Sequence, residues 1–387
     1  MDTLAFLVPV WGKDYVSLML NCLLPSLLTA NNLPTLSQHK RSVLVISTTI
    51  EGKELAQDSK VIQRCQEFLD IRFTLGDQYV DENKYSSMTR LYMLGLSSLN
   101  SGNNINVVYL TPDMFCSDGT VISLLRYLRQ GKKMIMVLGP RVVKDTFLKS
   151  IQPYLSDHSD CNDLGNTNFL TKLILAHLHP LSKTMNVLGN DFNYDWPSAL
   201  FWIEENIIIA HGFHLHPFLI CQDKDSIRDC SKSFSKHKHP PTIDHKEYLS
   251  LAVKQYNSDS IIVANPSDMI VVGLTEVKDE LIGKRFNRSV FSSTNASIFR
   301  ILYWSLLNTS DFQWDLFRYK VIYGSVNDAY SQALVDKSNI LVNKILKLKG
   351  NYLVMFCISS RMLLAKIKFL VSRAVQMPGR VLRKIRF

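Results

Sequence analysis

Short apolar runs alternate with longer, helix-like segments over the first 140 residues, and this alternation restricts the fold more than any other feature. The apolar runs end at turn residues and are too short for helices. Strands separated by helices form βαβ units, whose strands lie parallel in one sheet. We therefore predict an α/β fold with a Rossmann-like, mostly parallel sheet flanked by helices. The predicted strands are residues 4–10, 42–47, 71–75, 106–110 and 133–138, and the predicted helices are residues 15–28, 54–69, 84–99 and 117–129.

The sequence after residue 140 is less regular. A polar segment with one helix precedes two apolar runs, an exposed loop rich in Lys and His, and a second series of helices and strands. The predicted segments are a helix at 169–178, apolar runs within 196–221, a loop at 222–241, a helix at 244–256, strands at 260–263 and 269–274, and helices within 276–318. We predict a main domain at 1–275, a helical extension at 276–336 and a basic tail at 337–387.

The tail carries the basic excess of the chain. Residues 337–387 hold twelve Lys or Arg and no Asp or Glu. Subtracting these twelve from the net charge of +10 leaves about −2 for the first 336 residues. An anionic surface is therefore the expected partner of the tail, not of the body.

A helix at 361–377 would separate cations from apolar side chains. Its cations fall on one face and its apolar residues on the opposite face, as in helices that lie in a membrane interface. The cations are Arg361, Lys366, Lys368 and Arg373, and the apolar residues are Leu363, Ile367, Leu370, Val371 and Ala374. A helix packed on the body and a nucleic-acid-binding tail are the alternatives. The apolar face and the scarcity of aromatic residues argue against nucleic acid, and we expect no nucleic-acid partner.

Other features favour a cytoplasmic protein peripheral at the inner membrane. The longest uncharged run of the tail, 350–360, is too short to cross a bilayer, which takes about 20 residues. Gly350 and Pro378 are expected to divide the tail into short helices. Seven scattered cysteines without a CxxC motif fit a reducing compartment. The N-terminus has no cationic start and no cleavage site of a secretory signal.

One carboxylate follows a predicted buried strand directly. In parallel sheets the ligand lies beyond the carboxyl ends of the strands, and residues 106–110 end at Thr111-Pro112-Asp113. An Asp at this position can hold Mg²⁺ or Mn²⁺ against a diphosphate, because hard cations prefer oxygen ligands. The alternative role of Asp113 is that of a turn residue.

This layout resembles the GT-A glycosyltransferases, which use nucleotide-diphospho-sugars. The matching features are a first strand that ends in a short loop at Val8-Pro9-Val10-Trp11, a helix that begins near Lys84, and the strand before Asp113. The resemblance covers roughly residues 3–275. That family places a D-x-D motif at this strand end, and only its last position matches here. The resemblance implies a nucleotide-sugar donor, a divalent cation, and a site at Asp113.

Nucleotide-binding residues are expected where the strands end. Aromatic side chains there could stack on a base, and nearby cations could neutralise phosphates. A solvated helix face is the alternative for Arg90. The candidates are Pro9, Val10, Trp11, Tyr15, Thr48, Lys84 and Asp113, with Arg90 beside Lys84.

Three histidines form a second cluster, at His211, His214 and His216. On a strand His214 and His216 would share one face. Either could complete a metal shell or act as a base, and the resemblance implies a late metal ligand here, so we predict His216 or His214 beside Asp113. Packing against Phe213 and Phe218 is the alternative. A zinc site from His214, His216, Cys221 and Cys230 is a further alternative, although its spacing matches no familiar pattern.

Single carboxylates could supply a general base that deprotonates an acceptor hydroxyl. Asp244 is one candidate, although it could cap a helix in a capping box with Glu247. Asp268 is another, with a turn as its alternative role. Glu204 and Glu205 fall where such enzymes recognise the acceptor.

These observations predict a glycosyltransferase that transfers sugar to a glycan or lipid-linked acceptor at the membrane, in the synthesis of envelope polysaccharide or lipopolysaccharide. The sequence has no P-loop, no G-x-G-x-x-G after the first strand and no G-x-S-x-G elbow. The alternative is a non-catalytic scaffold on the membrane with a degenerate transferase fold. The missing first Asp of D-x-D favours that alternative.

Overall fold

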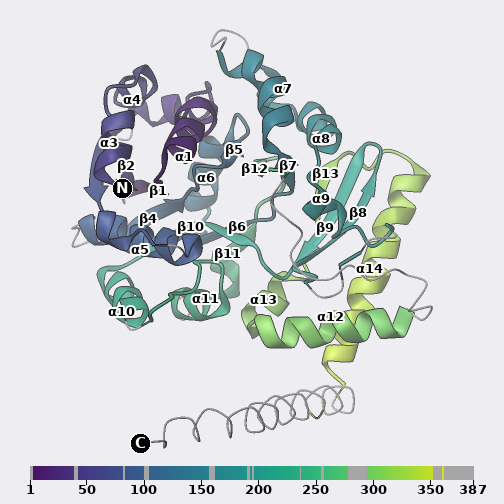
Figure 1. Cartoon of the computed structure of the whole chain (residues 1–387). Helices are drawn as coiled ribbons and strands as arrows, with labels where there is room; N and C mark the ends of the chain where they lie inside the picture. The colour runs from purple at the N-terminus through teal and green to yellow at the C-terminus, as the bar shows by residue number, and fades with distance from the viewer. Residues whose placement is uncertain are drawn as a thin grey trace, which may run out of the picture.

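The computed structural model describes residues 3–38, 42–81, 83–99, 104–156, 162–189, 192–193, 196–235, 237–253, 257–277, 294–351 and 360. Its centre is a seven-stranded sheet in the order β11-β6-β10-β4-β1-β2-β3 (Figure 1). The strands are β1 (Thr3–Pro9), β2 (Ser42–Thr48), β3 (Asp70–Leu75), β4 (Ile105–Tyr109), β6 (Met134–Val137), β10 (His216–Gln222) and β11 (Ile261–Val263).

All strands of this sheet are parallel except β10. Strand β1 pairs in parallel with β2 and β4, and β11 pairs in parallel with β6. Strand β10 runs antiparallel between β4 and β6. The predicted α/β fold with a mostly parallel sheet is therefore confirmed.

Helices cover both faces of this sheet, because each central strand is apolar on both sides. One core packs Leu7 and Val45 against α5 (Lys84–Ser98), α7 (Lys144–Ser156), α8 (Thr167–Ala176) and α11 (Lys246–Val253). The other core packs Phe6 and Ile46 against the helices that follow β1 and β2 and against α6 (Thr120–Arg129). Adjacent residues of one strand thus face opposite cores.

The helix predicted at 15–28 is interrupted before Pro25. It consists of α1 (Lys13–Leu18), a π-helical turn (Met19–Leu23) and α2 (Leu24–Leu27). Proline at the second position of a helical segment needs no N–H, and the wider turn before it accommodates the ring. The predicted helix at 54–69 is divided into α3 (Ile50–Ala56) and α4 (Lys60–Cys65).

Two smaller sheets lie beside the central one. Strands β5 (Met114–Cys116) and β7 (Arg141–Val143) flank β12 (Val271–Thr275). The antiparallel hairpin of β8 (Ala199–Glu204) and β9 (Ile207–Gly212) pairs with β13 (Val321–Gly324). The sheet of β8, β9 and β13 packs against α12 (Thr294–Asn308), α13 (Asp311–Leu316) and α14 (Ala329–Lys349).

This third core joins residues from both sides of the boundary predicted at 275. Its largest side chains are Trp202 and Phe213 from the hairpin region and Trp304, Trp314 and Phe317 from the helices. The predicted tail also begins inside it, because Val342 and Ile345 of α14 are buried there. Helix α14 ends before Gly350, as predicted. The amphipathic helix predicted at 361–377 lies outside the described residues.

Two local predictions are wrong. The loop predicted at 222–241 contains helix α10 (Lys224–Ser235), whose Ser226 and Cys230 are buried. The helix predicted at 117–129 begins at Thr120, since Gly119 with φ +88° occupies the N-cap position, and Ser117 and Asp118 precede the helix. Both side chains make other bonds: Ser117 Oγ accepts from the Ile270 N–H, and Asp118 binds Asn31. No helix in the described part of the chain is long and apolar enough to span a bilayer.

Candidate functional site

The strand order reverses between β1 and β4. From β1 the chain proceeds outward through β2 and β3, and then returns to place β4 on the other side of β1. In open α/β sheets such a reversal leaves a crevice at the carboxyl ends of the two strands, where ligands bind. The loops there are Val10-Trp11-Gly12 after β1 and Thr111-Pro112-Asp113 after β4.

Asp113 is fixed in this position by its backbone. Its carbonyl oxygen accepts a 2.7 Å hydrogen bond from the Leu274 N–H of β12, and Met114 N–H bonds Thr111 O at 3.1 Å. The carboxylate is half-buried, and within the described residues it makes no hydrogen bond or ion pair. Its charge raises the pKa of the buried Tyr92 phenol and opposes the lowering of the His216 pKa, so it lies close to both.

His216 reaches the same edge because β10 runs antiparallel. As the first residue of β10 it pairs with Val137, near the carboxyl end of β6. Its Nε2 is 2.8 Å from the carbonyl oxygen of Tyr109, the last residue of β4. A carbonyl only accepts, so Nε2 carries the proton and Nδ1 keeps a lone pair. Removal from water lowers the pKa of His216, which favours the neutral ring.

Asp244 comes to this neighbourhood from a distant segment. The predicted capping box is absent, because His245 precedes α11 and its Nδ1 accepts from the Glu247 N–H at 3.4 Å. The Asp244 carboxylate makes no hydrogen bond or ion pair within the described chain. Burial lowers the pKa of His214, and the Asp244 charge opposes this lowering. The Asp244 charge also adds to the raised pKa of the buried Tyr92.

The charges of Asp113 and Asp244 thus both act on Tyr92 and His216, although these side chains do not gather as around a metal ion. Tyr92 is fully buried, and its hydroxyl donates to Leu110 O at 2.6 Å, just beyond β4. Sequence reasoning did not identify Tyr92. The two carboxylates have no internal partner in the part of the chain that the structure describes, so either could move a proton.

The other two histidines of the cluster have structural partners. His211 is buried, donates from Nδ1 to Phe317 O at 3.1 Å, and packs between Trp202 and Phe317. His214 Nε2 is 3.3 Å from Asn308 O, and its ring lies 5.2 Å from that of Trp304. His214 therefore contacts α12.

A metal set of Asp113, His214 and His216 does not assemble as predicted. Throughout the described ranges, no three His, Cys, Asp or Glu side chains gather as they would around a metal ion. The alternative zinc site fails for the same reason, since Cys221 lies five residues from His216, about 17 Å along β10. His216 alone fits the usual pattern of a metal-ligating histidine, which donates its other ring N–H to a carbonyl. A cation here would need ligand oxygens from its substrate.

The predicted phosphate-binding cations on α5 have different roles. Lys84 is exposed and lies 5.4 Å from the Tyr85 ring centroid. Arg90 bonds Asp81 at 2.6 Å and Lys238 O at 2.5 Å, so it is not on a solvated face. Arg90 instead holds the segment that leads to Asp244 against α5.

The residues predicted after β1 and β2 differ in exposure. Trp11 is half-buried and Tyr15 is 41% exposed, so both rings are accessible. Pro9 and Val10 are buried and offer only backbone atoms. Thr48 is fully buried, and a Cβ added to Gly52 would lie 2.1 Å from its hydroxyl oxygen. A nucleotide cannot reach the Thr48 side chain in this arrangement.

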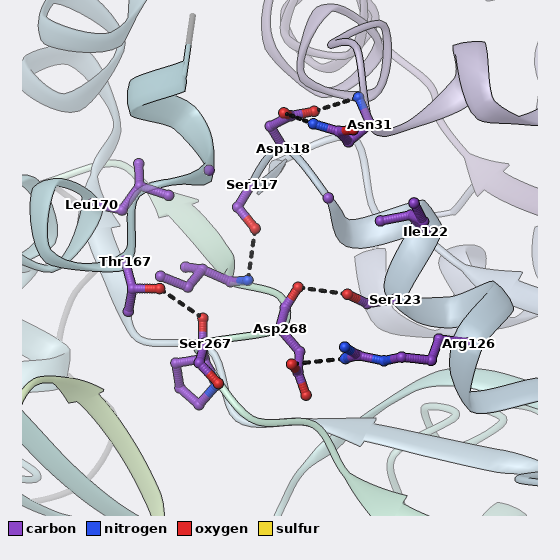
Figure 2. A pocket seen from close by; sticks show the side chains of 14 residues that line it. Asn31, Ser117, Asp118, Ile122, Ser123, Arg126, Thr167, Leu170, Ser267 and Asp268 are labelled. Atoms are coloured by element: carbon purple, nitrogen blue, oxygen red, sulfur yellow. Dashed lines mark hydrogen bonds and ion pairs between the residues drawn. The ribbon is translucent and has the colours of Figure 1, made fainter. Parts of the chain in front are cut away.

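Asp268 lies apart from the crevice, in a polar pocket of about 280 Å³ (Figure 2). Its carboxylate pairs with Arg126 at 2.7 Å and accepts from the Tyr127 hydroxyl at 2.5 Å. Strand β12 follows it and reaches Asp113 only at Leu274. The paired strands β5 and β12 thus separate the two carboxylates, with Asp113 at one end of the pair and Asp268 beyond the other end. The charge of Asp268 is already paired with Arg126.

Glu204 and Glu205 lie at the tip of the β8–β9 hairpin. Glu204 is the last residue of β8 and pairs with Ile207. The first residue of β8, Ala199, pairs with Gly212 near His214 and lies five residues from Glu204, about 17 Å along the strand. A hydrogen bond to Glu204 raises the pKa of Tyr330 on α14, so Glu204 contacts the helical unit. The structure does not bring Glu204 or Glu205 to Asp113.

Comparisons with known proteins give weak similarities. No protein-family model and no curated protein matches the sequence. Among solved structures, the chain is similar to S. aureus TarS (11% identity, 35% of this chain, 21% of that chain, TM-score 0.25) and to its 1–349 form (8%, 36%, 42% and 0.25). It is also similar to mouse xyloside xylosyltransferase 1 in its apo form (10%, 68%, 85% and 0.30). The chain matches less than half the length of either TarS structure. With overlaps this weak, the function has to be inferred from the residues of this chain.

Proposed function

We propose that this protein is a glycosyltransferase that binds a nucleotide sugar in the crevice between β1 and β4. The observation that carries the proposal is Asp113, a carboxylate without an internal partner among the described residues that follows β4 where the strand order reverses. The charges of Asp113 and Asp244 both act on the neighbouring His216. Crevices at this place in α/β sheets bind nucleotides. Trp11 and Tyr15 offer accessible rings for a base on the β1 side.

The residues take separate roles in this proposal. Asp113 would hold a divalent cation, which would neutralise the diphosphate when bound, and the Nδ1 of His216 has no internal partner within the described chain. Asp244 is the base: it takes the proton of the acceptor hydroxyl as that oxygen bonds to the sugar carbon. The bond from this carbon to the diphosphate breaks, and the nucleoside diphosphate leaves on the opposite face. Asp268 and Glu204 are weaker candidates because of their distance from Asp113.

Calorimetry with a panel of nucleoside diphosphates, with and without Mn²⁺, tests the donor site. We expect one nucleotide to bind, and we expect Asp113→Asn to weaken binding at least about tenfold, which corresponds to about 1.4 kcal/mol. Asp145→Asn, which alters an 82% exposed carboxylate on α7, is the matched control and should bind as the wild type does. Equal binding by both variants would remove Asp113 from the site.

A non-catalytic scaffold is the second candidate function. It is favoured by the single acidic residue in Thr111-Pro112-Asp113 and by the absence of a three-ligand metal group among the described residues. No binding of any nucleoside diphosphate, with a correctly folded protein, would favour it over the enzyme.

The acceptor in this proposal is a glycan or glycolipid of an envelope polysaccharide or lipopolysaccharide, at the cytoplasmic side of the inner membrane. The tail would concentrate the enzyme on the surface that holds its acceptor. Deletion of the tail should begin at 352, because α14 continues to Lys349 and is packed in the third core. We expect the shortened protein to float less with anionic vesicles. Equal flotation of both forms would remove the role of the tail.

A further inference from the structure

The outward face of α14 combines lysines with exposed apolar side chains. Lys337, Ile340, Lys344 and Lys347 fall within an arc of about 80° at the spacing of an α-helix. Tyr330 and Ala333 extend this arc toward the start of the helix. Ile340 is 68% exposed, the highest value among large apolar side chains of the described residues, and Tyr330 is 59% exposed. We call these six residues the α14 face.

The charged residues of this face are lysines, and the Glu204 carboxylate of the β8–β9 hairpin reaches the start of the face through a hydrogen bond with Tyr330. The nearest acid on the helix, Asp336, lies at its border and accepts a hydrogen bond from Gln332 at 3.1 Å. Lys349 is not part of the face, because it pairs with Asp311 at 3.2 Å and lies 4.8 Å from the Trp314 ring centroid. The side chain of Lys349 therefore points toward α13.

The orientation of the face is fixed by the opposite side of the helix. Leu334, Val342 and Ile345 are at most 3% exposed and pack into the third core. Rotation of α14 would expose these side chains, at a cost of roughly 1.5–3 kcal/mol each. The α14 face is thus a rigid surface of the folded body, about 26 Å long from Tyr330 to Lys347.

The chain continues from this helix into the most basic part of the sequence. Helix α14 ends before Gly350, and residues 352–387 hold eight Lys or Arg and no Asp or Glu. Because this segment follows α14 directly in the chain, an anionic surface that binds the segment is brought close to α14. Lysines attract anionic headgroups, and an exposed isoleucine among them can enter the headgroup boundary.

We propose that the α14 face docks on an anionic lipid bilayer. Lys337 and Lys347 meet the headgroups, and Ile340 enters the boundary of the acyl region. This inference rests on the membrane part of the proposed function and is independent of glycosyl transfer. It differs from attachment by a tail alone, because docking of a rigid face fixes the orientation of the body relative to the membrane.

Flotation of the full chain tests the proposal. The vesicles are equal parts phosphatidylcholine and phosphatidylglycerol, with pure phosphatidylcholine for comparison. The variants are K337E/K347E and Ile340→Ser. The matched control is K149E/K172E, which reverses two exposed lysines on α7 and α8, away from α14 (Figure 1). Thermal unfolding of each variant shows whether the fold is kept.

We expect K337E/K347E to weaken binding to the anionic vesicles at least about tenfold, since each lysine near such a surface contributes about 1 kcal/mol. Ile340→Ser should weaken it by a smaller factor, and the control should bind as the wild type does. Unchanged binding by both α14 variants would overturn the proposal and leave the tail as the anchor. Absence of wild-type flotation would overturn both membrane proposals, whereas the donor site is tested separately by calorimetry. Loss of binding to a DNA duplex in K337E/K347E, with vesicle binding unchanged, would assign the face to nucleic acid.

Discussion

The three histidines at 211, 214 and 216 carry their protons on different ring nitrogens. His211 donates from Nδ1 to Phe317 O, whereas His214 and His216 bond carbonyl oxygens through Nε2. In His211 the unprotonated Nε2 is buried without a partner. In His216 the unprotonated Nδ1 remains for a ligand at the crevice. Backbone contacts thus give three residues of one cluster different chemistry.

The buried His211 should make stability depend on pH. Burial lowers its pKa from 6.5 to about 4. As the pH falls below 6.5, His211 becomes protonated in the unfolded chain, whereas in the folded protein it stays neutral down to about pH 4. The free energy of unfolding therefore decreases as the pH falls through this window. We expect this residue to contribute up to about 1.4 kcal/mol per pH unit.

The variant His211→Asn keeps a donor for Phe317 O and cannot titrate. Urea unfolding between pH 4 and pH 6.5, the range set by these pKa values, should show a shallower slope for it. The lowered pKa values of His214 and His216 leave some slope in both proteins. An identical slope in wild type and variant would contradict the prediction.

Gln313 is a positioning residue that sequence reasoning missed. Its Oε1 accepts from Ser310 N–H at 2.9 Å, which closes a capping box on α13, while its Nε2 donates to Asp244 O at 3.2 Å. The pattern Ser-x-x-Gln at 310–313 is a recognisable cap signal. Nothing in the sequence shows that the same amide reaches Asp244.

Gln313→Glu separates these two functions. The carboxylate can still close the capping box, but it has no N–H for Asp244 O. We expect hydrogen exchange of the amides from 242 to 249 to become faster by on the order of tenfold, because one buried bond is lost. Ser310→Ala, which weakens only the cap at a cost of about 1 kcal/mol, is the control. Equal exchange in both variants would show that Gln313 acts through the helix alone.

At the scale of elements, Gly324 allows β13 to pair with β9. Its φ is +87°, and an added Cβ would lie 2.2 Å from the carbonyl oxygen of Asn206. Both the backbone conformation and the close approach therefore require glycine. Gly131 has a similar φ of +77° but no atom within 4 Å of the same position.

These two glycines form a matched pair for mutation. Gly131→Ala should cost about 1–2 kcal/mol, from the left-handed backbone alone. Gly324→Ala should cost about 1–3 kcal/mol more, because the Asn206 carbonyl must move. Chemical denaturation of both variants measures the difference. Equal costs would show that β13 shifts freely.

Some elements were hidden from sequence reasoning for identifiable reasons. In α10 the apolar face is narrow, since Ile227 and Cys230 stand among Lys, Asp and Ser, and the charged composition suggested a loop. The cap of α11 was misplaced by one residue, because His245 can accept a backbone N–H as Asp244 can. That shift leaves the Asp244 carboxylate for the crevice.

At the scale of the whole molecule, the third core unites segments that the sequence suggested were separate. The hairpin β8–β9 contributes Trp202 and Ile209, and the helices contribute Trp304, Trp314 and Phe317. Apolar patterns identify buried residues, but they do not show which distant segment covers them. The central sheet was predictable because its strands alternate locally with helices. The antiparallel direction of β10 was not predictable, because a buried strand is apolar throughout whether it runs parallel or antiparallel to its neighbours.

Two truncations test this division. A chain that ends at Thr275 lacks the helices that cover Trp202 and Ile209, and we expect it to bind the dye ANS and to aggregate. A chain that ends at Asn351 retains all three cores and should unfold at the temperature of the full protein. Cooperative unfolding of the shorter form, without dye binding, would show that 1–275 is an independent domain.

Strand β10 also affects how the protein forms during synthesis. Strands β4 and β6 leave the ribosome long before β10, which must insert between them. Until then, both carry unpaired backbone edges that can pair with another nascent chain. Since His216 and Asp244 arrive with these later segments, the proposed site forms only after most of the polypeptide has been translated.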